Sequence, residues 1–191
     1  DLSALTSITG GTHYGSSLVM AARFGAVLDL GGVTRIADPA GGDSRWRAIG
    51  ITAEGPATVI RLGALTSFID VYGTATSGDG LLSTLAARNG AAIEAGALVS
   101  LQGVRLALDD TGTVPIAQVA SFTSGRAELT GAAYAFPALT DVSGTDFVID
   151  AATPMENLCA FYGLPVPVEA QQSVAAWLRD EGITTPDGRG W

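Results

Sequence analysis

The sequence contains no lysine, one cysteine and one histidine, and only 15% of its 191 residues are charged. Its ten basic residues are all arginine and are spread along the chain, and the net charge is −9. Nucleic acids and anionic membranes are bound by clustered cations, so both are disfavoured as partners. No apolar run is long enough for a membrane-spanning helix, and the lone Cys159 cannot form an internal disulfide.

Residues for catalysis or metal binding are equally scarce. His13 is accompanied by no Gly-x-Ser-x-Gly elbow and no Cys/His cluster, which favours a structural or surface role over a catalytic base or zinc ligand. Cys159 fits a small buried side chain better than a reactive thiol. Gly10-Gly11-Thr12 lacks the Lys-Ser/Thr of a phosphate loop. We therefore expect no enzyme activity, no catalytic residue, no cofactor and no metal site.

What the chain does have is internal similarity. A shift of 71 positions lays 21–74 over 92–145 without a gap, and fourteen of the 54 aligned positions are identical, against roughly four or five expected by chance in an Ala- and Gly-rich chain. The first members of the identical pairs are Ala21, Gly25, Ala26, Leu30, Gly32, Val33, Asp38, Gly41, Thr52, Ala64, Asp70, Val71, Gly73 and Thr74. This pattern predicts a tandem duplication.

Each repeat consists of short segments rich in β-branched and aromatic residues, separated by glycine turns. Strands are expected at Ser17–Arg23, Ala26–Leu30, Val33–Ala37, Trp46–Ala53, Thr58–Leu62, Leu65–Tyr72, Ala97–Leu101, Val104–Leu108, Pro115–Thr123, Ala127–Phe136 and Asp146–Asp150. Spacings of about 8–12 residues are typical of a small barrel or sandwich. The predicted fold class is mainly β: two tandem duplicated small β-barrel or sandwich units, followed by a short C-terminal helical pair.

The expected domain organisation follows from these repeats. It comprises an N-terminal arm (1–15), β-repeat 1 (16–74), a linker with a short helix (75–90), β-repeat 2 (91–150), a helical C-terminal element (151–182) and a tail (183–191). The linker helix is placed at Leu81–Arg88, with Asn89-Gly90 as its C-terminal stop. In the C-terminal element, Thr153 and Pro154 are typical of a helix start.

A few side chains are candidates for contact with other molecules. Arg45, Trp46 and Arg47 form a site-like surface trio with no counterpart in the second repeat, although a strand edge carrying two solvated arginines is the alternative. Trp191 is unusual at a solvated end and is a candidate docking residue. Asp70 and Asp141 occupy equivalent repeat positions, where each is expected to bond its own turn rather than form a catalytic pair.

The segments "SLVMAARFGAVLDLGG", "VTRIADP", "WRAIGIT" and "ATVIRLGALTSF" follow one another in the first repeat. Over about residues 15–145 this layout resembles the small β-barrel modules of tailed-phage head-decoration proteins and of head or tail fibres. The resemblance implies a non-enzymatic virion structural protein that is homo-oligomeric, docks on other virion proteins and carries no catalytic residues. The virion would then be its location, after synthesis in the host cytoplasm. The alternative is a carbohydrate- or ligand-binding β-domain of a secreted or surface protein, with Trp46 as a stacking platform.

Overall fold

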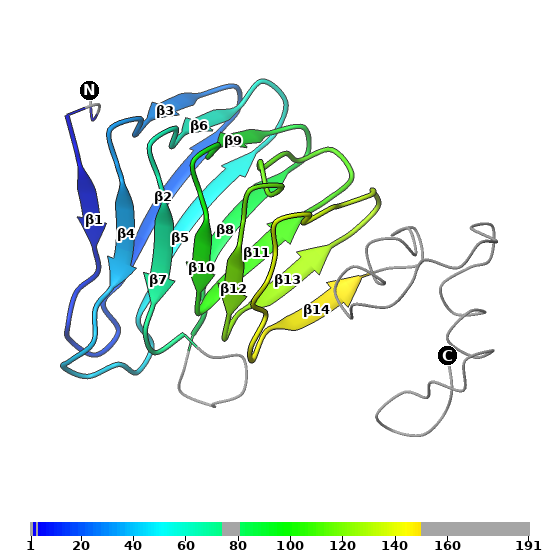
Figure 1. Ribbon diagram of the computed structural model, residues 1–191. Helices are drawn as coiled ribbons and strands as arrows, with labels where there is room; N and C mark the ends of the chain where they lie inside the picture. Colours follow the sequence, from blue (N-terminus) through cyan, green and yellow to red (C-terminus); the bar gives the residue numbers. More distant parts are fainter. Residues whose placement is uncertain (1, 3, 74–80, 150–191) are drawn as a thin grey trace, which may run out of the picture.

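The computed structural model, which describes residue 2 and residues 4–73 and 81–149, contains three parallel β-sheets wound into one solenoid (Figure 1). Every ladder between its named strands is parallel. The mainly β class predicted from the sequence is confirmed.

The strands fall into three sheets, which we call A, B and C. Sheet A contains β1 (Ser7–Thr9), β4 (Arg35–Asp38), β7 (Ser67–Asp70), β10 (Ser100–Gln102) and β12 (Ser121–Thr123). Sheet B contains β2 (Ser17–Arg23), β5 (Ala48–Glu54), β8 (Ser83–Arg88), β11 (Val104–Leu108), β13 (Arg126–Leu129) and β14 (Asp146–Ile149). Sheet C contains β3 (Val27–Asp29), β6 (Val59–Arg61) and β9 (Ala92–Glu94).

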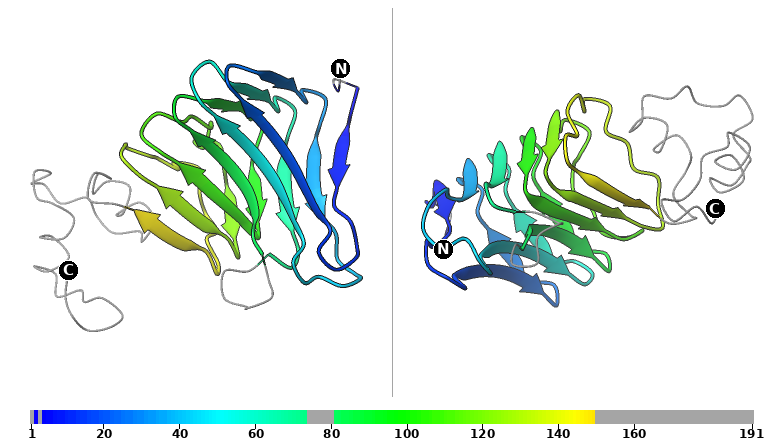
Figure 2. Two further views of the ribbon diagram at one scale, coloured as in Figure 1. Left: turned by 180° about the vertical axis from the view of Figure 1, so that it is seen from behind. Right: turned by 90° about the horizontal axis from the view of Figure 1, so that it is seen from below.

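From β2 to β10 the chain visits the sheets in a fixed order, B then C then A, and each pass adds one coil to the stack. Ser17 of β2 therefore pairs with Ala48 of β5, one coil later, and Val104 of β11 pairs with Ser83 of β8. Sheets A and B form the two broad faces and sheet C closes one side, as the rear and lower views show (Figure 2). A parallel neighbour is thus reached by way of the other faces, which supplies the long connection that parallel pairing requires.

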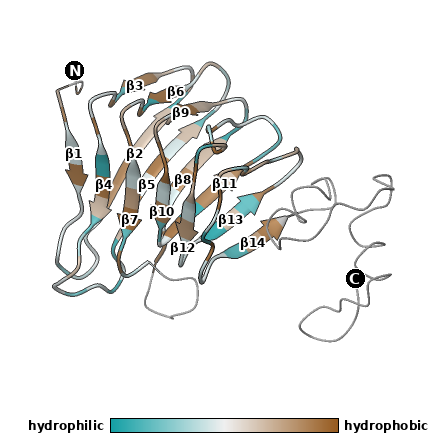
Figure 3. Ribbon diagram, in the orientation of Figure 1, coloured by the Kyte–Doolittle hydropathy of each residue, from teal (hydrophilic) through white to brown (hydrophobic). Residues whose placement is uncertain are grey.

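The core is built from inward side chains that stack on their equivalents in the next coil. In sheet A one such stack is Ile8, Ile36, Phe68, Leu101 and Phe122, each no more than 4% exposed. The alternation of apolar and polar residues along the strands, visible in Figure 3, follows from the two-residue period of a strand. Burial of one continuous column of aliphatic and aromatic side chains is what holds the coils together.

A nine-residue pattern marks the approach to sheet A in successive coils. Apolar residues recur at its first, third, sixth and ninth positions in residues 28–36, 60–68, 93–101, 114–122 and 134–142. The same backbone turn lies within each copy, with the N–H of the sixth residue donating to the carbonyl of the third, as in Val33 to Leu30 and Leu139 to Phe136. The first two intervals between copies are 32 and 33 residues, and the last two are 21 and 20 residues. The coils shorten in the same way, so the structural repeat is one coil.

The two separate β-barrel or sandwich units were therefore wrongly predicted, although most strand positions were right. β7 of the expected first unit pairs with β10 of the expected second unit, and β5 pairs with β8. The 71-residue shift is not the structural repeat, because it lays β4 of sheet A over β11 of sheet B. Glycines and small apolar residues recur in every coil, and such recurrence produces matches at several offsets.

The predicted helix at Leu81–Arg88 is also wrong, because Ser83–Arg88 is strand β8, paired on both sides with β5 and β11. Asn89 and Gly90 do take positive φ values of 56° and 81°, but they turn the chain from β8 into β9. The predicted helical element 151–182, the tail 183–191, Cys159 and Trp191 lie outside the described residues.

Candidate functional site

The predicted trio of Arg45, Trp46 and Arg47 lies in the loop that leads into β5, but its members face different surroundings. The Arg45 guanidinium is hydrogen-bonded to Asp43, with Nη2 2.6 Å from Oδ2, and lies over the Tyr14 ring at 5.3 Å. These hydrogen bonds lower the pKa of Asp43 to about 2. Trp46 is 43% exposed and adopts a positive φ of 58°, which is uncommon for a bulky residue.

Arg47 turns inward, which contradicts its expected place on a solvated strand edge. Its Nη2 lies 2.8 Å from Oδ1 of Asp38, and it also donates to the carbonyl oxygens of Pro39 and Gly41. The two charged side chains are only 1% and 3% exposed. Arg47 therefore fixes the loop between β4 and β5 and cannot contact a partner molecule directly.

Asp70 lies next to Asp38 in register, at the end of β7, and is also buried. Its carboxylate accepts hydrogen bonds from the Ser83 hydroxyl at 2.7 Å and from the Tyr72 N–H at 3.1 Å. Burial is the largest influence on the Asp70 pKa and raises it, outweighing these hydrogen bonds.

Asp141, by contrast, is exposed and bonds the N–H of Ser143, two residues on, as Asp70 bonds that of Tyr72. The prediction that each aspartate bonds its own turn is confirmed. Asp141 bridges to Ser121 in sheet A, and Asp70 is in register with Asp38, so the two carboxylates occupy different ladder positions and do not form a pair.

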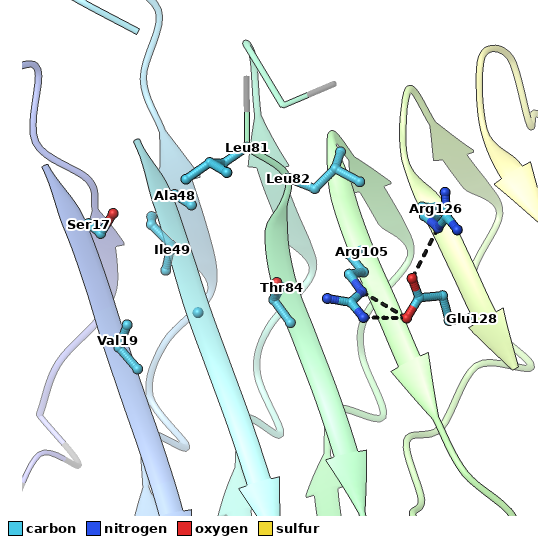
Figure 4. A pocket seen from close by; sticks show the side chains of 11 residues that line it. Ser17, Val19, Ala48, Ile49, Leu81, Leu82, Thr84, Arg105, Arg126 and Glu128 are labelled. Atoms are coloured by element: carbon cyan, nitrogen blue, oxygen red, sulfur yellow. Dashed lines mark hydrogen bonds and ion pairs between the residues drawn. The ribbon is translucent and has the colours of Figure 1, made fainter. Parts of the chain in front are cut away.

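The most site-like surface of the described chain is a groove of approximately 600 Å³ on the outer face of sheet B (Figure 4). Outward positions on β2, β5 and β8 carry Val19, Gly50 and Thr84, which form a low floor because their side chains are small. The residues that line the groove are Ser17, Val19, Ala48, Ile49, Gly50, Leu81, Leu82, Thr84, Arg105, Arg126 and Glu128.

Charged residues gather at one end of this groove. Glu128 of β13 accepts from Arg105 Nε at 2.8 Å and from Arg126 Nε at 3.0 Å, and Arg88 Nη2 lies 4.0 Å from the same carboxylate. Partial burial alone would raise the pKa of Glu128, but the hydrogen bonds and charges of Arg105 and Arg126 outweigh it and lower that pKa. β13, which carries Arg126 and Glu128, shows hydrophilic colour in Figure 3.

Sequence reasoning missed this cluster because Arg105 and Arg126 are far apart in the sequence and belong to no known motif. The nine-residue pattern is the sequence signal that could have shown that the two arginines lie on adjacent strands. Its copies at 93–101 and 114–122 are offset by the same interval as the two arginines, which places them in register on adjacent strands.

No metal-binding group of three or more His, Cys, Asp or Glu occurs among the residues that the structure describes, and no described helix is long and apolar enough to cross a membrane. No family model matches the chain, and no curated protein or solved structure matches it.

Proposed function

We propose that the chain is a non-enzymatic structural component of a virion, which acts by docking on like subunits and on other virion proteins. The observation that carries this proposal is the open strand edge at the first coil. β2 is the outermost strand of sheet B and, among the described strands, pairs only with β5. Unpaired strand edges are the surfaces through which β proteins add a further strand.

Side chains at this end support the same conclusion. Leu18, Met20 and Leu28 point toward the interior but are only partly buried, since no preceding coil covers them in the described chain. A second copy that pairs with β2 would cover these side chains and use the free hydrogen-bonding groups of a seven-residue strand. The placement on a phage particle is an expectation from the sequence resemblance alone.

The test is the oligomeric mass of the full chain by light scattering, compared with that of Met20→Lys. We expect a closed oligomer for the parent chain and a smaller species for the variant, because an inward charge at an edge opposes strand addition. The matched control is Val99→Lys. Val99 is exposed and lies in the middle of the solenoid, so this variant should assemble like the parent. A parent chain that is monomeric at all concentrations would contradict the proposal. The oligomeric mass of a chain without residues 183–191 tests the expected docking role of Trp191.

A second candidate function is ligand binding by a secreted or surface domain through Trp46. The exposure of Trp46 (43%) and of Tyr14 (61%) favours it, because aromatic faces are platforms for stacking. Binding to a broad panel of glycans that is lost in Trp46→Ala would support it, and no binding to any member of the panel would contradict it.

A further inference from the structure

We propose that the groove on sheet B binds an extended polysaccharide that carries carboxylates, with Arg105 and Arg126 as the carboxylate-binding residues. This binding function is distinct from the assembly function proposed above. The groove uses outward side chains on the lateral face of sheet B, with Ser17 and Val19 of β2 at one end, whereas the assembly surface is the open backbone edge of β2.

The charge of the groove is opposite to that of the protein. The chain has a net charge of −9, yet Arg88, Arg105 and Arg126 surround the single carboxylate of Glu128. Asp146, beside Arg126 in register, makes no ion pair with it in the described part of the chain. An anionic ligand is therefore attracted here in preference to a neutral or cationic one.

The two arginines are fixed by Glu128 and keep hydrogen-bond donors for such a ligand. Glu128 engages Nε and Nη2 of Arg105 but only Nε of Arg126. Nη1 of Arg105 and both Nη groups of Arg126 have no hydrogen-bond partner among the described residues. Figure 4 shows the Glu128 carboxylate linked to both guanidinium groups. Because planar guanidinium groups bind carboxylates through paired hydrogen bonds, a carboxylate suits these donors well.

The shape of the groove indicates a long ligand. The lining residues come from five neighbouring strands, from β2 to β13, which corresponds to about 19 Å along the stack at about 4.8 Å per strand. Away from the arginines the lining is Val19, Ala48, Gly50 and the two leucines, with the hydroxyls of Ser17 and Thr84. Aliphatic and small side chains suit the C–H faces of sugar rings, and the hydroxyls suit their polar edges.

A peptide is disfavoured by where the groove lies. A peptide that binds a β-sheet by strand addition gains affinity by pairing its backbone with an open strand edge. The groove lies on the face of sheet B, where the backbone groups of β5, β8 and β11 are already used by strands on both sides. A glycan has no backbone amides, so it does not need an open strand edge, and its hydroxyls can keep their hydrogen bonds to water at an open groove.

The experiment is calorimetric titration of the full chain with tetragalacturonate and with neutral galactotetraose, at low salt and at about 0.15 M salt. We expect the uronate to bind at least about tenfold more tightly than the neutral sugar and to weaken with salt, as charge-assisted contacts require. A hexaglutamate peptide tests for unselective attraction of anions.

Two variants assign the binding to the groove. Arg126→Gln should weaken uronate binding about tenfold or more. Gly50→Leu should abolish it by filling the floor, and the strand should tolerate the change because an added Cβ meets only Val19 Cγ2, at 3.7 Å, and more distant atoms. Thermal unfolding of both variants shows whether they fold.

The matched control is Arg61→Gln, which removes an exposed, ion-paired arginine from sheet C. This variant should bind the uronate like the parent chain. The proposal is overturned if tetragalacturonate does not bind, if galactotetraose or hexaglutamate binds as tightly, or if Arg61→Gln weakens binding as much as Arg126→Gln. Unchanged oligomeric mass of Arg126→Gln would keep this result separate from the assembly proposal.

Discussion

Arg47 and Asp38 form an ion pair inside the solenoid, with Nη2 2.8 Å from Oδ1 and side chains that are 1% and 3% exposed. The pair joins the end of β4 to the start of β5, and the remaining guanidinium donors bond the Pro39 and Gly41 carbonyls. A loop that contains proline and two glycines is thus held from inside by one cation.

Arg47→Ala should lower the free energy of unfolding by about 3–5 kcal/mol, because it leaves the Asp38 carboxylate buried without its partner. Arg45, two residues earlier, is more than half exposed and pairs with the partly exposed Asp43, so Arg45→Ala should have a much smaller effect. Urea unfolding of the two variants at pH 7 measures the difference. Equal losses in the two variants would show that burial of the Arg47–Asp38 pair is unimportant.

Asp70 should make the protein relatively more stable in acid. Its folded pKa is raised by burial above the ordinary value of 3.8, so the folded state holds the proton more tightly than the unfolded state. Its contribution is fully present below the unfolded pKa and is lost as the pH rises through the folded pKa. Asp70→Asn, which removes this titration, should therefore be most destabilising near pH 3 and less so near pH 7.

Unfolding curves of the parent chain and Asp70→Asn, recorded at several pH values between those limits, test this sign. The measured quantity is the difference in unfolding free energy between the two proteins at each pH. A difference that grows as the pH rises would contradict the raised pKa.

Glu128 should behave in the opposite way. Partial burial alone would raise its folded pKa, but Arg105 and Arg126 outweigh burial and lower the pKa below the ordinary value of 4.5. Its contribution is present above the unfolded pKa and is lost as the pH falls through the folded pKa. Glu128→Gln should destabilise the protein near pH 7 and have little effect in strong acid. The same unfolding series measures this, and a loss that is larger in acid than at neutral pH would show that the arginines do not stabilise the charged carboxylate.

Strand positions could be predicted from the sequence, whereas strand partners could not. The segments Ser17–Arg23 and Val104–Leu108 were predicted with the bounds that they have, because local alternation and glycine turns report which residues form a strand. Alternation gives the inward face but neither the neighbour nor the direction of pairing, so the same pattern suits a barrel and a solenoid. Loops of different length between coils then hid the shared nine-residue pattern.

The errors at Leu81–Arg88 and Arg47 have the same origin, which is tertiary context. Leucine, alanine and arginine have high intrinsic helix propensity, but the ladders with β5 and β11 on either side impose the extended conformation on Ser83–Arg88. From the sequence alone, Arg47 is expected at the surface, because its buried partner Asp38 is identified only by the structure. The groove depends on Arg105 and Arg126 being in register, which only the coil length reveals.

Gly42 and Gly15 offer a direct measure of close packing at the loop that Arg47 holds. Both have a φ of +66°, so alanine at either position bears the cost of the left-handed conformation, about 1–2 kcal/mol. An added Cβ at Gly15 meets nothing within 4 Å, but at Gly42 it would overlap the Thr12 carbonyl oxygen. Gly42→Ala must therefore also displace the segment that contains Thr12, whose carbonyl accepts the Asp43 N–H.

We expect Gly42→Ala to lower the thermal unfolding midpoint clearly more than Gly15→Ala does. Because φ is the same at the two positions, the left-handed cost is shared and the difference between the variants reports mainly the steric contact. Calorimetry of both variants measures it, and equal midpoints would mean that the 39–47 loop does not pack against Thr12.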